Sequence, residues 1–174
     1  EITQKALAKN PAERYQTCMD LAYDLRVALR GFTETVNNGK VKDVVDFMLH
    51  LPFFNNFSKE HIKELIATSK ITKVRKGKTI VTEGEIDDTF YIILSGKVTI
   101  IKGDKTISVI GHGECFGEMA YICGQARAAT VIAETDCILL IISAPLLDRS
   151  SESIQLLFFK NFAITLVNRL SQTS

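Results

Sequence analysis

The sequence lacks the features that would place it in several large classes of protein. Its formal net charge is only +1, which gives no broad electrostatic attraction to nucleic acid or to an anionic membrane. No apolar run approaches the roughly 20 residues that span a bilayer, and no signal peptide opens the chain. We therefore expect neither nucleic acid nor membrane among the partners, and we expect a cytoplasmic location.

Metal-binding patterns are also missing. The cysteines form no CxxC pair, and the three histidines lie far from one another, so a zinc site is not expected. The absence of an HxH cluster likewise excludes a cupin-like metalloenzyme. We expect free thiols in a reducing compartment, no metal and no cofactor. The residues concerned are Cys18, Cys115, Cys123, Cys137, His50, His61 and His112.

Catalytic signatures are absent as well. The chain contains no HRD, DFG or GxSxG motif, and no pair of catalytic carboxylates can be argued from it. The fragment is therefore not expected to be an enzyme. Because the chain begins at Glu1 without a methionine, in a stretch with helical character, we expect it to be a piece of a longer protein.

What is present divides the chain by periodicity and by glycine. Residues 1–30 contain no glycine and carry apolar residues at helical spacing, with Asn10-Pro11 separating two helices. The polar segment 31–40, GFTETVNNGK, is typical of a linker. The ranges 41–50 and 59–69 again predict helices, and Ser58 is the expected N-cap of the second one.

Seven short β-rich runs follow, separated by eight of the ten glycines of the chain. Such regular punctuation predicts a β-sandwich or β-barrel, here of the jelly-roll kind with flanking helices, in the α+β class. Lys102-Gly103-Asp104-Lys105 and Ser95-Gly96 are expected to be hairpin turns. The runs are ITKVR, KTIVTE, FYIIL, KVTIIK, KTISVI, ATVIA and CILLII, between residues 71 and 142.

The C-terminal segment from residue 154 to 170 predicts a helix that is apolar nearly all round, which implies burial on more than one side. One side can cover the barrel. The other side needs a second partner, for which the candidates are the base of a ligand, the N-terminal helices or another subunit in a homodimer.

The stretch FGEMAYICGQARAAT, residues 116–130, carries the candidate chemistry. Gly117 lets the backbone approach a ligand, and the free amides of the following helical turn form an anion cradle. Arg127 can bind a phosphate through its forked donors, whereas the carboxylate of Glu118 can only accept, for example from a sugar hydroxyl. The pair thus fits a ligand with one phosphate and one nearby hydroxyl. The alternative is a plain Glu118–Arg127 ion pair that closes a barrel corner.

The same residues resemble the phosphate-binding cassette of the cyclic nucleotide-binding domain, found in regulatory subunits of cAMP-dependent protein kinase and in catabolite-activator-type regulators. The family form is F-G-E-(L/I)-A, a short helix, and R-(A/S/T)-A-T, and the likeness extends from about residue 41 to 170, including GEIDDTFYIILSGKVTI. The resemblance implies that Glu118 binds the ribose 2′-hydroxyl and Arg127 the cyclic phosphate. The backbone amides of Gly117, Glu118, Met119, Ala120, Ala128 and Ala129 would complete the phosphate shell.

The resemblance favours cAMP over cGMP as the ligand. In cGMP-selective kinases the residue after the arginine is typically a threonine that engages the guanine, and here that residue is Ala128. No residue of the C-terminal helix can be assigned as a cap on the base. A degenerate, ligand-free domain that serves as a dimerisation or interaction scaffold is the alternative function.

A second resemblance lies at the N-terminal end. KALAKNPAERYQTCMDLAYDL, residues 5–25, is similar to the last two helices of a bacterial, eukaryotic-type Ser/Thr protein kinase domain, although the glutamate partner expected for Arg14 is absent. An unrelated helical extension is the alternative. We therefore expect kinase helices over 1–30, a linker over 31–40 and a cyclic nucleotide-binding domain over 41–174, which regulates a parent Ser/Thr kinase in cis during signal transduction.

Overall fold

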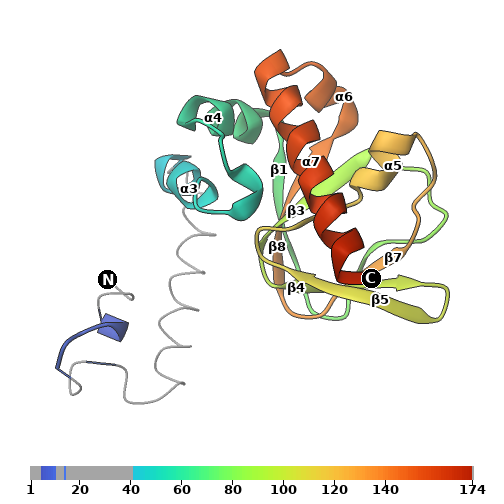
Figure 1. Cartoon of the computed structure of the whole chain (residues 1–174), viewed down its shortest axis with the longest axis horizontal. Coiled ribbons are helices and arrows are strands. Elements are labelled where there is room, and N and C mark those ends of the chain that lie inside the picture. The colour runs from blue at the N-terminus through green and yellow to red at the C-terminus, as the bar shows by residue number, and fades with distance from the viewer. Residues whose placement is uncertain (1–4, 11–13, 15–40, 174) are drawn as a thin grey trace. The chain divides into compact units, whose positions relative to one another are not determined.

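The structure is a computed structural model that describes residues 5–10, 14 and 41–173 (Figure 1). The chain divides into two compact units, residues 1–46 and 47–174, and the second unit contains both sheets. Most of the expected kinase-like helices and the whole expected linker, 31–40, lie outside the described residues. The domain boundaries drawn from the sequence therefore stay predictions.

Between residues 41 and 69, three short helices precede the sheets: α3 (Val41–Met48), the 3₁₀ helix η2 (Pro52–Phe54) and α4 (Lys59–Thr68). The predicted N-cap of α4 is confirmed, because the Ser58 hydroxyl accepts from the backbone N–H of His61 at 3.2 Å. His61 completes a capping box, since its Nδ1 accepts from the Ser58 N–H at 3.3 Å. Two otherwise unpaired amides at the start of the helix are thereby satisfied.

All seven predicted strands are present, with bounds within two residues of those expected. One sheet has the order β1-β8-β3-β6 and the other the order β2-β7-β4-β5. The sequence did not predict β6, which is only two residues long. The strands are β1 (Lys70–Val74), β2 (Thr79–Val81), β3 (Thr89–Ser95), β4 (Lys97–Lys102), β5 (Lys105–Gly111), β6 (Cys115–Phe116), β7 (Thr130–Ala133) and β8 (Cys137–Ser143).

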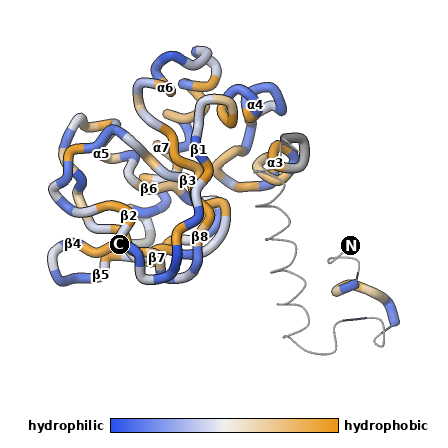
Figure 2. Tube along the Cα trace, turned by 180° about the vertical axis from the view of Figure 1, so that it is seen from behind, coloured by the Kyte–Doolittle hydropathy of each residue, from blue (hydrophilic) through white to orange (hydrophobic). Residues whose placement is uncertain are grey.

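The central strand β3 is apolar on both faces because both faces are covered. Tyr91 and Ile93 point into the core between the two sheets, whereas Phe90 lies against Phe158 and Phe162 of the C-terminal helix. This explains the uninterrupted apolar run FYIIL, which is unlike the alternation of a half-exposed strand. Figure 2 shows the contrast between the hydrophobic strands and the hydrophilic tip of the β4–β5 hairpin.

One of the two predictions of a hairpin turn is wrong. Lys102 pairs with Lys105, so the β4–β5 hairpin is confirmed, but Ser95-Gly96 joins β3 of one sheet to β4 of the other. Gly96 is a corner between the sheets. It has a φ of +95°, and a Cβ built there would lie 2.5 Å from the carbonyl oxygen of Asp136. The short linker resembles a hairpin in sequence because both connections need a glycine at positive φ.

Replacing Gly96 by alanine is therefore expected to lower the free energy of unfolding by roughly 2–5 kcal/mol, from the left-handed backbone and the overlap with a backbone oxygen. Denaturant unfolding measures this loss. Gly103→Ala is the matched control, because Gly103 has a φ of +55° but a Cβ added there would have no heavy atom within 4 Å. Equal losses in the two variants would contradict the role of Gly96 as a crowded corner.

The chain ends in α5 (Glu118–Cys123), which lies between β6 and β7, and then α6 (Ala144–Asp148) and α7 (Glu152–Thr173) after the sheets. Helix α7 crosses one sheet (Figure 1) and buries Ile154, Phe158 and Phe162. Burial on more than one side is not seen, because Leu156, Val167 and Leu170 are 63–70% exposed. The packing of α7 thus buries only one of its two apolar sides.

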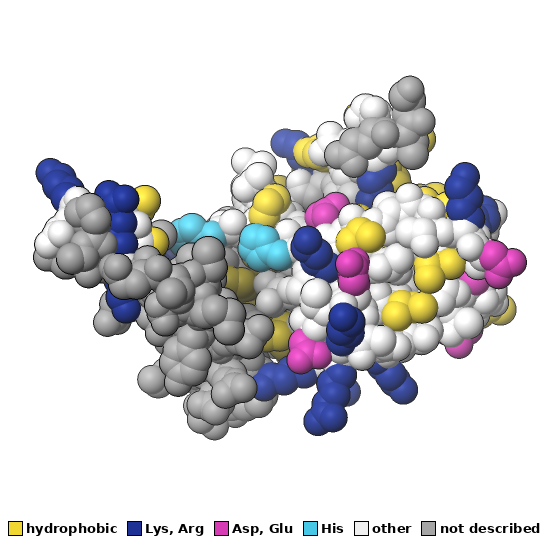
Figure 3. All heavy atoms as spheres, turned by 90° about the horizontal axis from the view of Figure 1, so that it is seen from below, with side chains coloured by type: hydrophobic (Ala, Val, Ile, Leu, Met, Phe, Trp, Pro, Cys, Tyr) yellow, Lys and Arg dark blue, Asp and Glu magenta, His cyan; other side chains and the backbone are white. Residues whose placement is uncertain are grey.

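The described surface carries no large field of one sign on the face drawn in Figure 3, where basic, acidic and hydrophobic side chains are interspersed. Within the described ranges, no helix is both long and apolar enough to cross a membrane. The same residues contain no group of three or more His, Cys, Asp or Glu side chains that could hold a metal ion.

Candidate ligand-binding site

The candidate site is built on β6, α5 and the loop that leads to β7. Strand β6 pairs with β3 through Phe116 and Tyr91, whose rings stack with centroids 4.8 Å apart. Gly117 then turns the chain at a φ of +85° to start α5, and Gly124 ends the helix in the same left-handed region. The predicted short helix between these two glycines is confirmed, and its first turn is fixed to the sheet by Phe116.

Glu118 is almost completely buried, with 1% of its surface exposed. Its Oε1 accepts a hydrogen bond from Nη1 of Arg169 on α7 at 2.6 Å, and Nη2 of Arg169 donates to the carbonyl oxygen of Cys115. The other carboxylate oxygen, Oε2, is buried without a hydrogen-bond partner among the described residues. Burial raises the pKa of Glu118, and the nearby positive charge of Arg169 opposes that rise.

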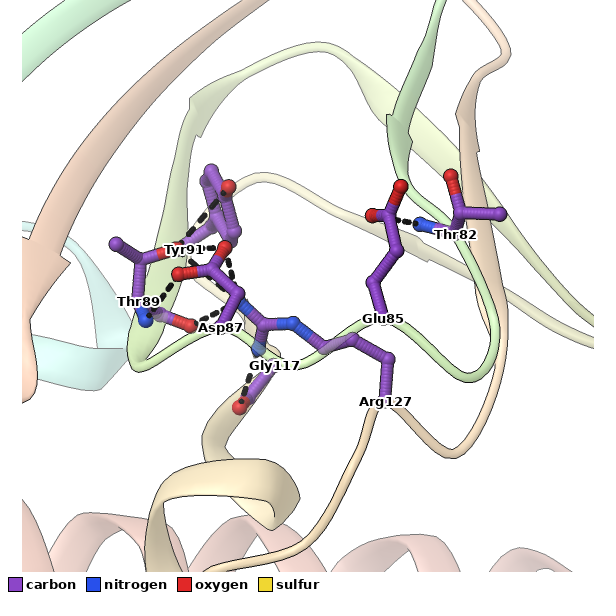
Figure 4. Close-up of polar contacts among 7 residues, drawn as sticks. All are labelled: Thr82, Glu85, Asp87, Thr89, Tyr91, Gly117 and Arg127. Carbon is purple, nitrogen blue, oxygen red and sulfur yellow. Dashed lines mark hydrogen bonds and ion pairs between the residues drawn. The ribbon is translucent and has the colours of Figure 1, made fainter.

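Arg127 is 3% exposed and reaches from the β7 side of the site toward β3. Its Nη1 donates to the carbonyl oxygen of Gly117 at 3.0 Å, and its Nη2 donates to the Thr89 carbonyl at 2.5 Å and to Oδ2 of Asp87 at 2.8 Å (Figure 4). Burial alone would raise the pKa of Asp87, but hydrogen bonds from Thr89 and Arg127 hold it below its ordinary value. The guanidinium Nε remains buried without a partner in the described part of the chain.

The backbone of Arg127 is held as firmly as its side chain. Its N–H donates to the Glu85 carbonyl at 2.8 Å, and its own carbonyl accepts from the N–H of Gly84 at 2.9 Å. Gly117 is constrained by the same arginine, because a Cβ there would lie 2.7 Å from Nη1 of Arg127. The glycine is therefore required by the guanidinium as well as by the positive φ.

A cavity of about 230 Å³ connects these groups. Its lining includes every residue that the sequence singled out: Gly117, Glu118, Met119, Ala120, Arg127, Ala128 and Ala129. Apolar side chains from the two sheets and from α7, among them Ile100, Ile107 and Leu166, form much of the remaining wall, together with Ser108 and Arg169. The structure thus brings the seven residues together, while their individual roles toward a ligand stay predictions.

The alternative in which Glu118 and Arg127 neutralise each other is wrong. Each forms its ion pair elsewhere, Glu118 with Arg169 and Arg127 with Asp87. The two side chains instead present separate groups to one cavity.

Sequence reasoning missed Arg169, Asp87 and Thr89. Arg169 is one of only two cationic residues between positions 154 and 170, and that isolated charge in an apolar helix was the available signal. Asp87 and Thr89 belong to the segment GEIDDTFY, where two adjacent aspartates give no indication of which one turns inward. Only the contacts with Arg127 distinguish Asp87 from Asp88.

The fold and the cavity together define a candidate small-molecule-binding domain, in which a buried glutamate and a buried arginine line the same cavity. Residues 71–151 match the family model of the cyclic nucleotide-binding domain. This part of the chain is therefore similar to cyclic nucleotide-binding domains, and it is homologous to the regulatory subunits of cAMP-dependent protein kinase.

Individual relatives agree with this assignment. The chain is 27% identical over 166 residues to a cGMP-dependent protein kinase of Eimeria tenella, covering 84% of this chain and 17% of the relative. It is 35% identical over 86 residues to a cAMP-dependent protein kinase regulatory subunit of Eremothecium gossypii, covering 49% and 19%. The solved regulatory domain of Toxoplasma gondii PKA with cAMP superimposes with a TM-score of 0.60 at 25% identity, covering 68% of this chain and 48% of that one.

The match spans less than a fifth of the length of the first two relatives. The activities of those whole proteins therefore cannot be assigned to this chain from the match alone.

Proposed function

We infer that this domain binds a cyclic nucleotide in the cavity beside α5, with cAMP preferred over cGMP. The observation that carries this proposal is the pair of buried, unpartnered polar atoms on two residues that line one cavity, Oε2 of Glu118 and Nε of Arg127. A buried polar group without a partner costs about 1–3 kcal/mol. A ligand that offers a hydroxyl donor to the first and an anionic oxygen to the second would remove both costs.

The two anchors differ in a way that fits a cyclic nucleotide. Glu118 accepts only, so it suits the ribose 2′-hydroxyl, and Arg127 donates only, so it suits the cyclic phosphate. The first amides of α5 have no acceptor within the helix, and Ala128 and Ala129 line the same cavity. These amides would complete the phosphate shell.

The proposed preference for cAMP rests on the residues that line the rest of the cavity, where the base of the nucleotide would lie. Ala128 offers no hydroxyl to a guanine, and Ile100, Ile107 and Leu166 supply apolar surface. The hydroxyl of Ser108 can both donate and accept, so it does not select between adenine and guanine by itself. The cap on the base stays unassigned.

We further propose that ligand binding regulates an attached Ser/Thr protein kinase in the cytoplasm. The relatives named above include a cGMP-dependent kinase and a regulatory subunit, and residues 5–25 resemble the end of a kinase domain. Glu118 contacts both the cavity and Arg169 of α7. A ligand that binds better in one position of α7 would shift the population of positions, typically by 1–3 kcal/mol of coupling.

A scaffold function is the second candidate, and one observation favours it. Leu156, Val167 and Leu170 leave an exposed apolar strip along α7, which a second copy of the chain could cover in a homodimer. In that case the domain would retain the fold without needing a ligand.

Thermal melting with cAMP and with cGMP separates the two functions. A ligand held at 100 times its Kd adds about 2.7 kcal/mol to the free energy of unfolding, which for a chain of this size raises Tm by roughly 5–11 °C. We expect the larger shift with cAMP. The absence of a shift with either nucleotide would reject the binding function and leave the scaffold.

Arg169→Gln is expected to move the acid limit of cAMP binding to higher pH. Burial already raises the pKa of Glu118, and Arg169 is the charge that opposes the rise, so its loss raises that pKa further. As the pH falls through the raised pKa, Glu118 becomes protonated and loses part of its capacity to accept the ribose hydroxyl. Titration calorimetry between about pH 5 and pH 8 measures the limit, and the same limit in both proteins would contradict the role of Glu118.

A further inference from the structure

A second cavity adjoins the first, and Arg169 lines both. It has a volume of about 330 Å³ and is enclosed by the segment at η2, the β5–β6 loop and one side of α7. The two cavities therefore share a wall. The lining residues used below are Asn55, Asn56, Glu114, Asn161, Asn168 and Arg169.

Carboxamides dominate the polar lining of this cavity. Four of the seven asparagines of the chain line it, although they come from two segments about 100 residues apart. Each carboxamide presents an NH₂ donor beside a C=O acceptor. The polar lining of this cavity is therefore rich in side chains that both donate and accept hydrogen bonds.

One of these carboxamides is built into the core. Asn161 is only 6% exposed, and its Nδ2 donates to the carbonyl oxygen of Phe53 at 2.6 Å. Its Oδ1 makes no hydrogen bond within the described part of the chain. This oxygen is not one of the fully buried atoms that lack a partner, so it is accessible from the cavity that Asn161 lines, where a ligand can donate to it.

The charged groups of the lining already have partners in the protein. Arg169 donates to Glu118 and to the Cys115 carbonyl, and Oε2 of Glu114 accepts from the Gly111 N–H at 2.7 Å. The remaining polar lining is neutral. The cavity therefore suits an uncharged ligand and does not suit a phosphate or a carboxylate.

We propose that this cavity is a second ligand site, which takes a neutral nucleoside whose donors and acceptors pair with the carboxamides of Asn56, Asn161 and Asn168. A carboxamide matches the paired donor and acceptor on the edge of a purine, and the volume is within the usual range for small-molecule sites, about 300–1,000 Å³. The ribose hydroxyls of a nucleoside are also neutral donors and acceptors, so they could pair with the same carboxamides. The site itself does not depend on the function proposed above.

Occupancy of this site is expected to change the affinity of the neighbouring cavity, and this part rests on the proposed binding of cAMP. The ligand would lie against Arg169, the residue that holds Glu118. Coupling between two sites usually changes an affinity by about 5- to 150-fold.

Titration calorimetry of the chain with adenosine, guanosine and D-ribose tests the site. We expect at least one nucleoside to bind, and we expect Asn168→Ala and Asn56→Gly each to weaken it about tenfold or more. Asn168 is exposed, and Asn56 has a φ of +71°, which glycine adopts readily, so both variants should fold; melting curves check this. Binding of D-ribose with the same sensitivity would assign the recognition to the hydroxyls, whereas binding of nucleosides alone assigns it to the base.

Arg127→Lys is the control that distinguishes this site from the first cavity, because it alters only the first one. Nucleoside binding that survives Arg127→Lys but is weakened by the asparagine variants supports the second site. Binding that is kept in the asparagine variants places the nucleoside outside the second cavity and overturns the proposal, whether or not Arg127→Lys weakens it, because a nucleoside has no phosphate for Arg127 to bind. Failure of all three probes to bind at millimolar concentration also overturns it, whether or not cAMP binds.

Discussion

Arg127→Lys is expected to weaken cAMP binding more than tenfold while leaving the domain folded. A hydrogen bond to a charged group contributes about 1.5–3 kcal/mol, and each 1.4 kcal/mol is a factor of ten in Kd. The side chain also contacts Gly117, Thr89 and Asp87 at once. A lysine ammonium is a single point charge and cannot reach these acceptors and a phosphate together. Titration calorimetry with cAMP measures the change.

The matched control is Arg75→Lys, which makes the same substitution at an exposed position outside the cavity lining. We expect its affinity for cAMP to equal that of the unmodified chain. If Arg127→Lys also binds cAMP with unchanged affinity, the guanidinium is not the phosphate anchor, and its contacts with Asp87 and Thr89 are its whole role.

Phe158→Ala is expected to cause the largest loss of stability, about 3–5 kcal/mol. Phe158 is 0% exposed, and its ring lies 5.4–5.8 Å from the rings of Phe53, Phe57 and Phe162 and 5.6 Å from Phe90. Its removal would leave a cavity where η2, β3 and α7 meet. Melting curves should show Tm lower by roughly 6–20 °C, at about 2–4 °C per kcal/mol.

Phe159→Ala is the control for this variant, because it removes the same atoms from the next residue of the same helix. Phe159 is 46% exposed and lies beside Tyr121 at 6.0 Å, so we expect a loss of less than about 2 kcal/mol. Similar losses for the two variants would mean that the cluster around Phe158 is not the main attachment of α7 to the sheet.

The strands and the short helix of the site could be predicted because their signals are local. Runs such as FYIIL and CILLII are apolar enough to form buried strands, and the glycines between the runs permit the turns. Gly117 and Gly124 bound α5 as expected. The corner at Gly96 could not be told from a hairpin turn, since the difference lies in which sheet the next strand joins.

The partners of the two charged residues could not be predicted in the same way. Arg169 lies 51 residues from Glu118, and Asp87 lies 40 residues from Arg127. No periodicity or motif connects such positions. The contact exists because α7 packs across β3 through Phe158 and Phe162, which brings Arg169 to the start of α5.

The sequence by itself determined the order of the elements, the class of the fold and the one segment, residues 117–129, that supplies seven of the residues in the cavity lining, because each depends on neighbouring residues along the chain. The tertiary structure alone decided that Glu118 and Arg127 do not neutralise each other. It also decided that a carboxamide-lined cavity shares Arg169 with the first one. Side chains far apart in sequence meet only through packing, and packing depends on the whole fold at once.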